Sequence, residues 1–364
     1  MIRHQKNIFK GLKVLELASV LAGPAVGMFF AELGAEVTKV ENPKVGGDVT
    51  RNWLSKGEQR KGYSAYFSSV NWGKKHLMLD YSNPEELKQV LTLVADSDVI
   101  ITNFKQGDDV KFGLDYRSLS AINSTLIYAQ LNGFVSDPER PAFDAVLQAE
   151  TGFMSMNGSE ESGPIKMPVA LIDVLAAHQM KEAILLGLIN KLQNGKGALI
   201  EVSLEQAALA SLANQATNWL MNKSIPQRLG SLHTNIAPYG DTFVCGDERE
   251  IVLAVGSDAQ FKLLCETIGV SKEEMLFFQS NKTRVEHRSH LRKVLSENIA
   301  QRKSSGLMNK LLSLKIPAGF IRNLDEVLES DTAQSMILSE VINDEETRRL
   351  SGNAFTIRFN PESE

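Results

Sequence analysis

The sequence predicts an α/β protein with a doubly wound parallel sheet and a second, smaller α/β domain. Residues 12–17, 25–34 and 36–41 have the patterns of a strand, a helix and a strand, the unit from which parallel sheets are built. Strand-like and helical segments then alternate up to residue 204, which favours a doubly wound sheet. A chain of 364 residues is also too long for one compact core, so roughly two domains are expected.

The predicted helix at 25–34 has clear boundaries, because Pro24 lies near its first turn and Gly34 at its C-terminal end. A possible capping box of Ser203 and Gln206 marks the start of another helix. The further strands expected in this part are 76–80, 98–104, 125–131 and 198–204, and the further helices are 83–97, 115–123, 173–195 and 203–222.

The pattern changes near residue 225, where a turn-rich segment begins. Residues 241–257 predict a hairpin around Gly246 and Asp247. Helices are expected after it at 258–268, 284–300, 305–314 and 324–336, with extended chain at 315–323. The predicted organisation is a large domain at 1–200 to which 325–364 returns, a linker helix at 201–227, a small domain at 228–315 and a return linker at 316–324.

Composition excludes several classes of protein. The net charge of -5 leaves no basic field to hold nucleic acid. Cys245 and Cys265 fit neither a metal site nor a disulfide framework, so we expect core thiols in a reducing compartment. No apolar run approaches the ~20 residues that cross a bilayer, and residues 1–14 lack the apolar core of a secretory signal. We therefore expect a cytoplasmic protein without a membrane partner.

The first strand–helix–strand unit raises the question of dinucleotide binding. Glu41 closes the second strand, where a ribose-binding acid would stand. The turn, however, contains A-G-P-A-V-G instead of G-x-G-x-x-G, and Pro24 removes a backbone N–H that a phosphate needs. NAD binding is therefore disfavoured.

Asp173 interrupts the apolar stretch PVALIDVLAAH, residues 168–178. One reading is that it caps the helix that follows. The other is that it is a reactive carboxylate in a place where water is scarce. The two are compatible, because a helix N-terminus favours the anion, and an ionised, partly desolvated carboxylate can attack an activated acyl group. Two loops are further candidates: 46–53, whose Arg51 and Trp53 can grip an anion and a flat group, and 103–107, which follows a strand.

Ordered motifs then place these residues in a wider pattern. The run AGPAVGMFFAELGAEVTKVENPKVGGDVTRNW (22–53) is followed by matching segments at 77–80, 98–104, 112–116, 143–158, 171–207, 228–240 and 311–328. Together they resemble the class III CoA-transferases, which include formyl-CoA transferase and carnitine CoA-transferase and share their fold with 2-methylacyl-CoA racemase. The resemblance implies a large Rossmann-like domain, a small α/β domain, and ring-shaped subunits that interlock as a homodimer, an exception to the rule against threaded chains.

The resemblance also implies a site. The family's nucleophile falls on Asp173, and Asp144 matches an acid near it. Trp53, Arg51 and Phe143 would form the substrate pocket. The residues matched to CoA contacts are Val20, Leu21, Ala22, Asn42, Leu79, Asn103, Phe104, Lys111 and Phe112. Asn42 and Ser82 stand where formyl-CoA transferase has an Arg and a Lys, which predicts weaker or differently placed phosphate contacts.

The implied activity is transfer of CoA between an acyl-CoA and a small carboxylic acid through an aspartyl anhydride and an aspartyl thioester. It requires no metal or permanently bound cofactor, but it requires oxyanion donors at the helix start and the exclusion of water. One alternative is a racemase on the same fold, which would need a His where this chain has Phe143. Another is a non-catalytic CoA-binding protein, against which the retained Asp173 argues.

Overall fold

The computed structural model describes residues 8–60, 62–342 and 344–358, so parts of the N-terminal stretch 1–14 and of the returning segment 325–364 lie outside it. The chain divides into two compact units. The large unit comprises 1–153, 166–225 and 331–364, and the small unit comprises 154–165 and 226–330. The linkers expected at 201–227 and 316–324 stay predictions.

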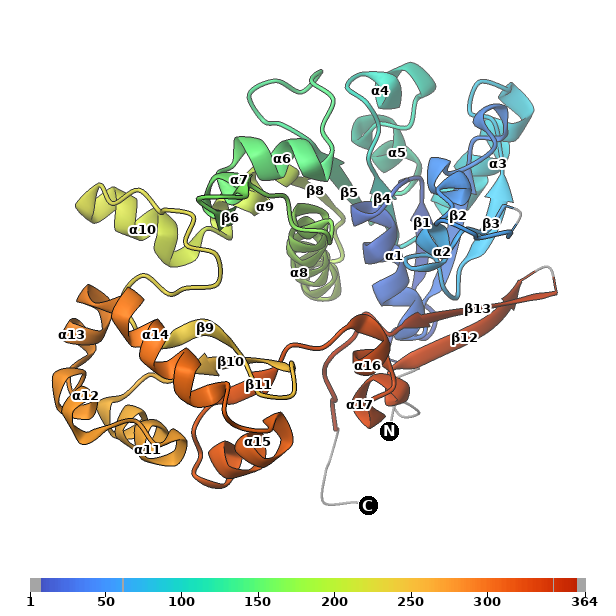
Figure 1. Ribbon diagram of the computed structural model, residues 1–364. Coiled ribbons are helices and arrows are strands. Elements are labelled where there is room, and N and C mark those ends of the chain that lie inside the picture. Colours follow the sequence, from blue (N-terminus) through green and yellow to red (C-terminus); the bar gives the residue numbers. More distant parts are fainter. Residues whose placement is uncertain (1–7, 61, 343, 359–364) are drawn as a thin grey trace. The chain divides into compact units, whose positions relative to one another are not determined.

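A six-stranded parallel sheet lies at the centre of the large unit (Figure 1). Its strands are β1 (Lys13–Glu16), β2 (Glu36–Glu41), β3 (Lys75–Met78), β4 (Val99–Thr102), β5 (Ile127–Asn132) and β8 (Ala198–Ser203). Their order in space is β3-β2-β1-β4-β5-β8. Leu15 of β1 pairs with Thr38 on one side and Ile100 on the other. The order of the strands therefore reverses between β1 and β4.

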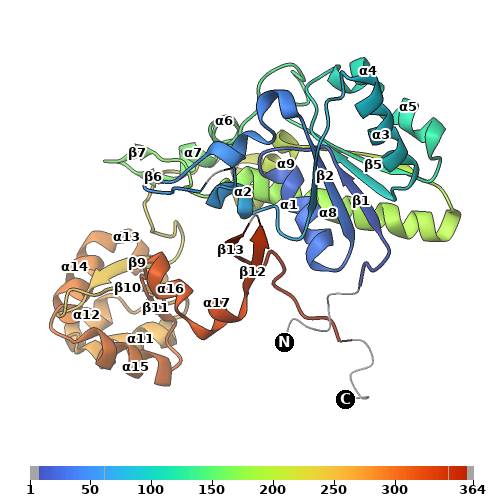
Figure 2. The ribbon, with the colours of Figure 1, turned by 90° about the vertical axis from the view of Figure 1, so that its right-hand side faces the viewer.

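Helices cover both faces of this sheet (Figures 1 and 2). On one face, α1 (Ala22–Glu32) and α8 (Leu171–Asn194) pack against strand residues such as Val14. On the other face, α3 (Pro84–Ala95) and α5 (Tyr116–Ile122) pack against strand residues such as Leu15. Successive strand residues point to opposite faces, and both faces are buried, which explains the continuous apolar runs seen in the sequence.

The helix expected at 203–222 is two helices, α9 (Leu204–Ala210) and α10 (Ala213–Asn222). Ser203 caps α9, as predicted, because its hydroxyl accepts a hydrogen bond of 3.0 Å from the Gln206 N–H. The break follows Ser211, and Ala213 has a positive φ of 48°. A left-handed residue interrupts helical geometry, so the single predicted helix was wrong.

The helix expected at 324–336 is two short helices, and the second, α17 (Asp331–Ser335), belongs to the large unit. After it, β12 (Ile337–Ile342) and β13 (Glu345–Leu350) form an antiparallel hairpin that the sequence pattern did not predict. Glu32 of α1 holds the segment that follows. Its carboxylate accepts hydrogen bonds from Ser351 Oγ at 2.8 Å, the Gly352 N–H at 3.0 Å and Asn353 Nδ2 at 2.9 Å. This segment is thereby fastened to α1.

Smaller elements of the large unit follow the strands. They are η2 (Pro43–Val45), η3 (Val49–Asn52), α2 (Ala65–Ser68), α4 (Asp108–Phe112) and α6 (Asp144–Glu150). The chain passes between the two units through α7 (Phe153–Met156), after which β6 (Gly158–Ser159) and β7 (Gly163–Pro164) form a short hairpin. Half of the candidate site residues lie in or directly beside these elements: Asn42, Arg51, Trp53, Lys111, Phe112, Phe143 and Asp144.

The small unit contains an antiparallel sheet of order β11-β10-β9 and its own core. The strands are β9 (Tyr239–Val244), β10 (Glu250–Ala254) and β11 (Ala318–Phe320), and the helices are α11 (Asp258–Ile268), α12 (Lys272–Phe277), α13 (Asn281–Glu286), α14 (Arg288–Ile299), α15 (Ser304–Ser313) and α16 (Leu324–Leu328). Val244 pairs with Glu250, so the predicted hairpin is confirmed. Cys245 and Cys265 are buried free thiols, as expected.

Within the described ranges, no helix combines the length and the apolar character needed to cross a membrane. In the same part of the chain, no three His, Cys, Asp or Glu side chains gather as a metal site would require.

Candidate active site

The carboxyl ends of β1 and β4, where the strand order reverses, are where an open α/β sheet is expected to bind its ligand. Asn103, just after β4, connects these two strand ends. Its Oδ1 accepts a hydrogen bond of 3.0 Å from the Ser19 N–H, and its Nδ2 donates one of 2.9 Å to the Ser19 carbonyl. The predicted CoA contact at Asn103 therefore uses its amide to hold the turn that follows β1.

That turn leads directly into α1. Leu21 occupies the N-cap position, and the helix begins at Ala22, three residues before the predicted start at 25. Pro24 falls in the first turn, where a missing N–H costs nothing. Val20 has a φ of 75°, and its N–H donates to Asp48 at 3.1 Å. The structure thus places Val20, Leu21 and Ala22 in the turn after β1 and at the start of α1.

Asp173 is the third residue of α8, and its N-cap position is occupied by Ala170 without a side-chain hydrogen bond. The prediction that Asp173 caps its own helix is therefore wrong. The side chain of Asp173 is only 9% exposed. No donor in the described part of the chain is hydrogen-bonded to its carboxylate, so both oxygens can accept a new partner.

The cap of α8 comes from Asp144, the first residue of α6. Its Oδ1 accepts a hydrogen bond of 2.7 Å from the Ile172 N–H, and its Oδ2 accepts one of 2.6 Å from Gln148 Nε2. Gln148 in turn accepts a hydrogen bond of 2.8 Å from the Met167 N–H. A helix start leaves N–H groups that need acceptors, and a carboxylate from another helix supplies one here.

The two carboxylates affect each other. Burial raises the pKa of Asp173, and the negative charge of Asp144 raises it further, to about 7. The expectation that the helix start keeps this carboxylate fully ionised at neutral pH is therefore corrected. Loss of water is the larger cause and the like charge of Asp144 the smaller, so Asp173 is partly protonated near neutral pH.

An aromatic pair lies beside these acids. Tyr66 of α2 and Trp53, which follows η3, have ring centroids 5.0 Å apart in an edge-to-face arrangement. Burial raises the pKa of Tyr66, and the charges of Asp173 and Asp144 raise it further, which places its phenol near both carboxylates. Phe143 precedes Asp144 and is 56% exposed. The structure thus groups Trp53 with Tyr66, a residue that the sequence analysis missed.

Arg51 does not point to this group. Its guanidinium makes two hydrogen bonds to Glu41, of 2.6 and 2.5 Å, and one of 2.8 Å to the Gly62 carbonyl. It also lies 3.9 Å from the ring centroid of Phe67. Burial acts to raise the pKa of Glu41, but hydrogen bonds from Arg51 and His76 lower it. The predicted role of Arg51 as an anion grip is therefore corrected to a buried ion pair.

Four of the predicted CoA-contact residues lie beyond the carboxyl ends of β3 and β4. Leu79 and Tyr81 belong to one buried cluster, against which Phe104 and Phe112 pack. The ring of Tyr81 lies 5.9 Å from each of these phenylalanines. Lys111 is exposed, with its Nζ 5.3 Å from the ring centroid of Phe112. This cluster offers an apolar surface with a cation beside it.

A second cation, Lys44, lies near Asn42 and Ser82, the two positions where formyl-CoA transferase has an Arg and a Lys. Asn42 caps η2 by accepting a hydrogen bond of 2.9 Å from the Lys44 N–H. The Lys44 ammonium lies 2.5 Å from Ser82 Oγ and 2.7 Å from Asp80. Sequence reasoning weighed positions 42 and 82 and missed Lys44, although it stands only two residues from Asn42.

Comparison with known proteins shows similarity over nearly the whole chain. The model of CoA-transferase family III matches residues 9–364. Succinate–glutarate CoA-transferase of Agrobacterium fabrum is 35% identical over 91% of this chain and 84% of its own length. Human succinyl-CoA:glutarate CoA-transferase is 33% identical over 87% of this chain and 72% of its own length.

A solved structure extends the agreement to the fold. The crystal structure of a CAIB/BAIF family protein from Brucella suis is similar with a TM-score of 0.86 and 36% identity, over 98% of this chain and 94% of that one. The mixed α/β architecture with its parallel central sheet is therefore shared with that protein. From the family match and these relatives, the chain belongs to CoA-transferase family III and is a transferase that uses acyl-CoA as a substrate.

Proposed function

We propose that this enzyme transfers CoA between two small dicarboxylic acids, with Asp173 as the nucleophile. The observation that carries the proposal is the state of the Asp173 carboxylate, which is buried, has both oxygens available and stands at the start of a helix capped by a second acid, Asp144. The acid substrates are inferred from relatives that are named for succinate and glutarate.

The proposed reaction has four steps. An Asp173 oxygen attacks the thioester carbonyl, the carbon–sulfur bond breaks, and CoA leaves as a thiolate, giving a mixed anhydride. The thiolate attacks the Asp173 carbonyl carbon and releases the donor acid as its carboxylate. The acceptor carboxylate attacks the aspartyl thioester and expels the thiolate, forming a second anhydride. The thiolate then attacks the acceptor's acyl carbon, which yields the new acyl-CoA and regenerates Asp173.

Both intermediates react with water, so the site must exclude it. The burial of Asp173 beside Trp53 and Tyr66 supports this requirement. Oxyanion donors were expected among the first N–H groups of α8, but that of Ile172 already donates to Asp144. We therefore expect the donors to come from the rest of that first turn or from the turn after β1.

We further propose that CoA lies across a Rossmann-like sheet, from the turn at Val20 to the cluster at Phe104 and Phe112. The strand order β3-β2-β1-β4-β5-β8 supports a Rossmann-like description, and its reversal lies between β1 and β4. Lys111 and Lys44 are the cations available for the phosphates of CoA along this path.

We also propose that two copies interlock as a homodimer. Apolar side chains on α8 and on the edge strand β8 support a partner surface, because Leu186, Leu192 and Leu199 are 67%, 87% and 44% exposed. Native mass spectrometry should give twice the chain mass. Because interlocked chains separate only by unfolding, dilution should not release monomers.

Trapping with hydroxylamine tests the nucleophile. With succinyl-CoA, the wild-type chain should form a hydroxamate on Asp173 that peptide mass spectrometry locates, and Asp173→Asn should form none. An unmodified Asp173 across a panel of acyl-CoA donors contradicts the proposal. Exchange of the α-proton in deuterated water without CoA transfer indicates a racemase instead. If neither CoA transfer nor proton exchange occurs, the chain is a non-catalytic CoA-binding protein.

A further inference from the structure

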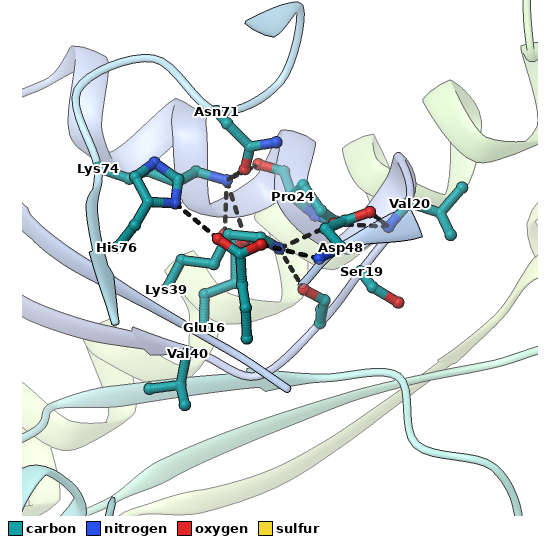
Figure 3. A network of polar contacts seen from close by, with 12 residues as sticks. Glu16, Ser19, Val20, Pro24, Lys39, Val40, Asp48, Asn71, Lys74 and His76 are labelled. Carbon is teal, nitrogen blue, oxygen red and sulfur yellow. Dashed lines mark hydrogen bonds and ion pairs between the residues drawn. The ribbon is translucent and has the colours of Figure 1, made fainter. Parts of the chain in front are cut away.

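Four charged side chains lie buried beneath the turn that follows β1 (Figure 3). We call Glu16, Lys39, Asp48 and Lys74 the charged network. Lys39 Nζ lies 3.0 Å from Glu16 and 3.1 Å from Asp48, while Lys74 Nζ lies 2.8 Å from Glu16. Each acid thus has an amine partner within ion-pair distance, which offsets part of the cost of burying these charges.

The charged network holds the main chain of the turn at three points. Lys39 donates a hydrogen bond of 2.5 Å to the Ala18 carbonyl, at the start of the turn. Asp48 accepts from the Val20 N–H at 3.1 Å, in its middle. Lys74 donates one of 2.8 Å to the Pro24 carbonyl, in the first turn of α1. Figure 3 shows these contacts converging from β1, β2 and the loops after β2 and α2.

Val20 is the strained residue of this turn. A φ of 75° is left-handed, a region that a β-branched side chain avoids and that glycine enters freely. Such strain persists only where the surroundings over-determine it, and it gathers at functional sites. Here Asp48 holds the Val20 N–H, and Asn103 holds both main-chain groups of Ser19.

The charged network is also closely packed. A Cβ added to Gly27 of α1 would lie 1.9 Å from Glu16 Oε2, so this acid approaches α1 at a distance that only glycine permits. Buried ion pairs are costly to desolvate, and apolar residues often stabilise a core as well or better. The charges are therefore better explained by the conformation that they impose than by stability.

We propose that Asp48 is a positioning residue that, together with Lys39, holds Val20 in the left-handed conformation in which the turn binds acyl-CoA. The inference rests on the proposed function, which places CoA against this turn. The side chains of Ser19, Val20 and Leu21 are half-buried, so the turn remains accessible above a buried support.

The first experiment measures CoA affinity by calorimetry, without turnover. Among the described residues, the Asp48 carboxylate contacts four donor groups: the Val20 N–H, the Thr50 N–H, the Thr50 hydroxyl and the Lys39 ammonium. In Asp48→Asn the amide NH₂ replaces one carboxylate oxygen and cannot accept a hydrogen bond, so at least one of these donors loses its acceptor. The dissociation constant of CoA and the KM for succinyl-CoA should rise about tenfold, with kcat changing much less, because the lost interaction acts in binding.

The deciding measurement is a double-mutant cycle with Val20→Gly. Glycine adopts the left-handed conformation without support, so Asp48→Asn should weaken CoA binding much less in the Val20→Gly background than in the wild type. A residue needed only for general stability would cause the same loss in both backgrounds, and that result overturns the proposal. Unchanged CoA affinity in Asp48→Asn also overturns it.

Two further variants complete the design. Asp98→Asn breaks an ion pair with Lys191 at the amino end of β4, away from the turn after β1. It should therefore lower stability and leave CoA affinity unchanged. If Asp48→Asn does not fold, Thr50→Val replaces it, because this variant removes only the 2.8 Å hydroxyl contact to Asp48. Thr50→Val should weaken CoA binding by a smaller factor, and Val20→Gly should suppress that defect. If Val20→Gly does not suppress it, the proposal is overturned. Hydroxylamine trapping on Asp173 tests the proposed function separately.

Discussion

The side chain of Asp144 caps the helix that carries Asp173, because its Oδ1 accepts a hydrogen bond of 2.7 Å from the N–H of Ile172. One acid thus fixes the start of α8 and at the same time places a negative charge near the other acid. Structure and reactivity are coupled through this contact, and the coupling can be measured.

Neutralising Asp144 should shift the pH dependence of the reaction. In the wild type, the acylation rate of Asp173 should fall about tenfold for each pH unit below about 7, because only the carboxylate attacks. Asp144→Asn keeps an acceptor for the Ile172 N–H but removes the charge, so the pH midpoint should move down. The pH profile of hydroxamate formation measures it. Glu150→Gln, at the other end of α6, is the matched control and should leave the midpoint in place.

Asp173 should reduce stability at neutral pH. Its folded pKa of about 7 lies above the ordinary value of 3.8, so the unfolded chain loses this proton at a lower pH than the folded chain does. Burying Asp173 therefore costs no stability from this source below about pH 4, and the free energy of unfolding falls as the pH rises from there through 7. At about 1.4 kcal/mol for each pH unit, Asp173→Asn should be more stable than the wild type by up to about 4 kcal/mol at pH 8 and by almost nothing at pH 4. Urea unfolding across this range checks it, and a gap that does not change with pH contradicts it.

Lys44 should bind a phosphate of CoA at the adenine end. Lys44→Met removes the ammonium group that lies near Ser82 and should raise the KM for succinyl-CoA about tenfold. If the contact is with the 3′-phosphate, the same variant should bind dephospho-CoA as the wild type does. Lys196→Met, just before β8 at the amino edge of the sheet, serves as the control. Equal losses for CoA and dephospho-CoA would show that Lys44 contacts another group.

Lys74, just before β3, should matter more for stability than Lys13, an exposed lysine of β1. Burial lowers the pKa of Lys74 to about 7 against the pull of Glu16, so at pH 6 it is charged. Lys74→Met should then cost about 3 kcal/mol, at the low end for a broken buried pair, because Lys39 still neutralises Glu16. Lys13→Met breaks an exposed pair with Asp96 and should change the urea midpoint little. Similar shifts in both variants would contradict the prediction.

Local sequence patterns predicted the elements whose signals are local. The strand expected at 36–41 is β2, Glu36–Glu41, because its run of β-branched residues packs into the sheet. The start of α8 was predicted at residue 173 but lies at Leu171, because the group that caps this helix is not local in the sequence. Asp173 is a good capping residue by type, but the acceptor that caps α8 comes from Asp144 on another helix, and no local pattern contains that contact.

The site residues follow the same division. Arg51 was read as an anion grip from the composition of its loop, whereas its partner Glu41 is on β2. Asp48 and Tyr66 were missed because their neighbours come from distant segments: Val20 and Lys39 for the one, the two acids for the other. Ordered motifs located Asp173, but its charge state depends on burial and on Asp144, which only the folded chain specifies.

The two thiols described above have a practical consequence for labelling. Cys245 and Cys265 are both buried in the small unit, and burial raises the pKa of each thiol, that of Cys265 to about 12. Neither presents a thiolate to a maleimide dye near neutral pH. A cysteine introduced at Leu276 of α12, which is 68% exposed and lies outside the proposed partner surface, would therefore be the one readily labelled thiol in an otherwise native chain. Fluorescence transfer between two such labels can then report whether copies of the chain come together.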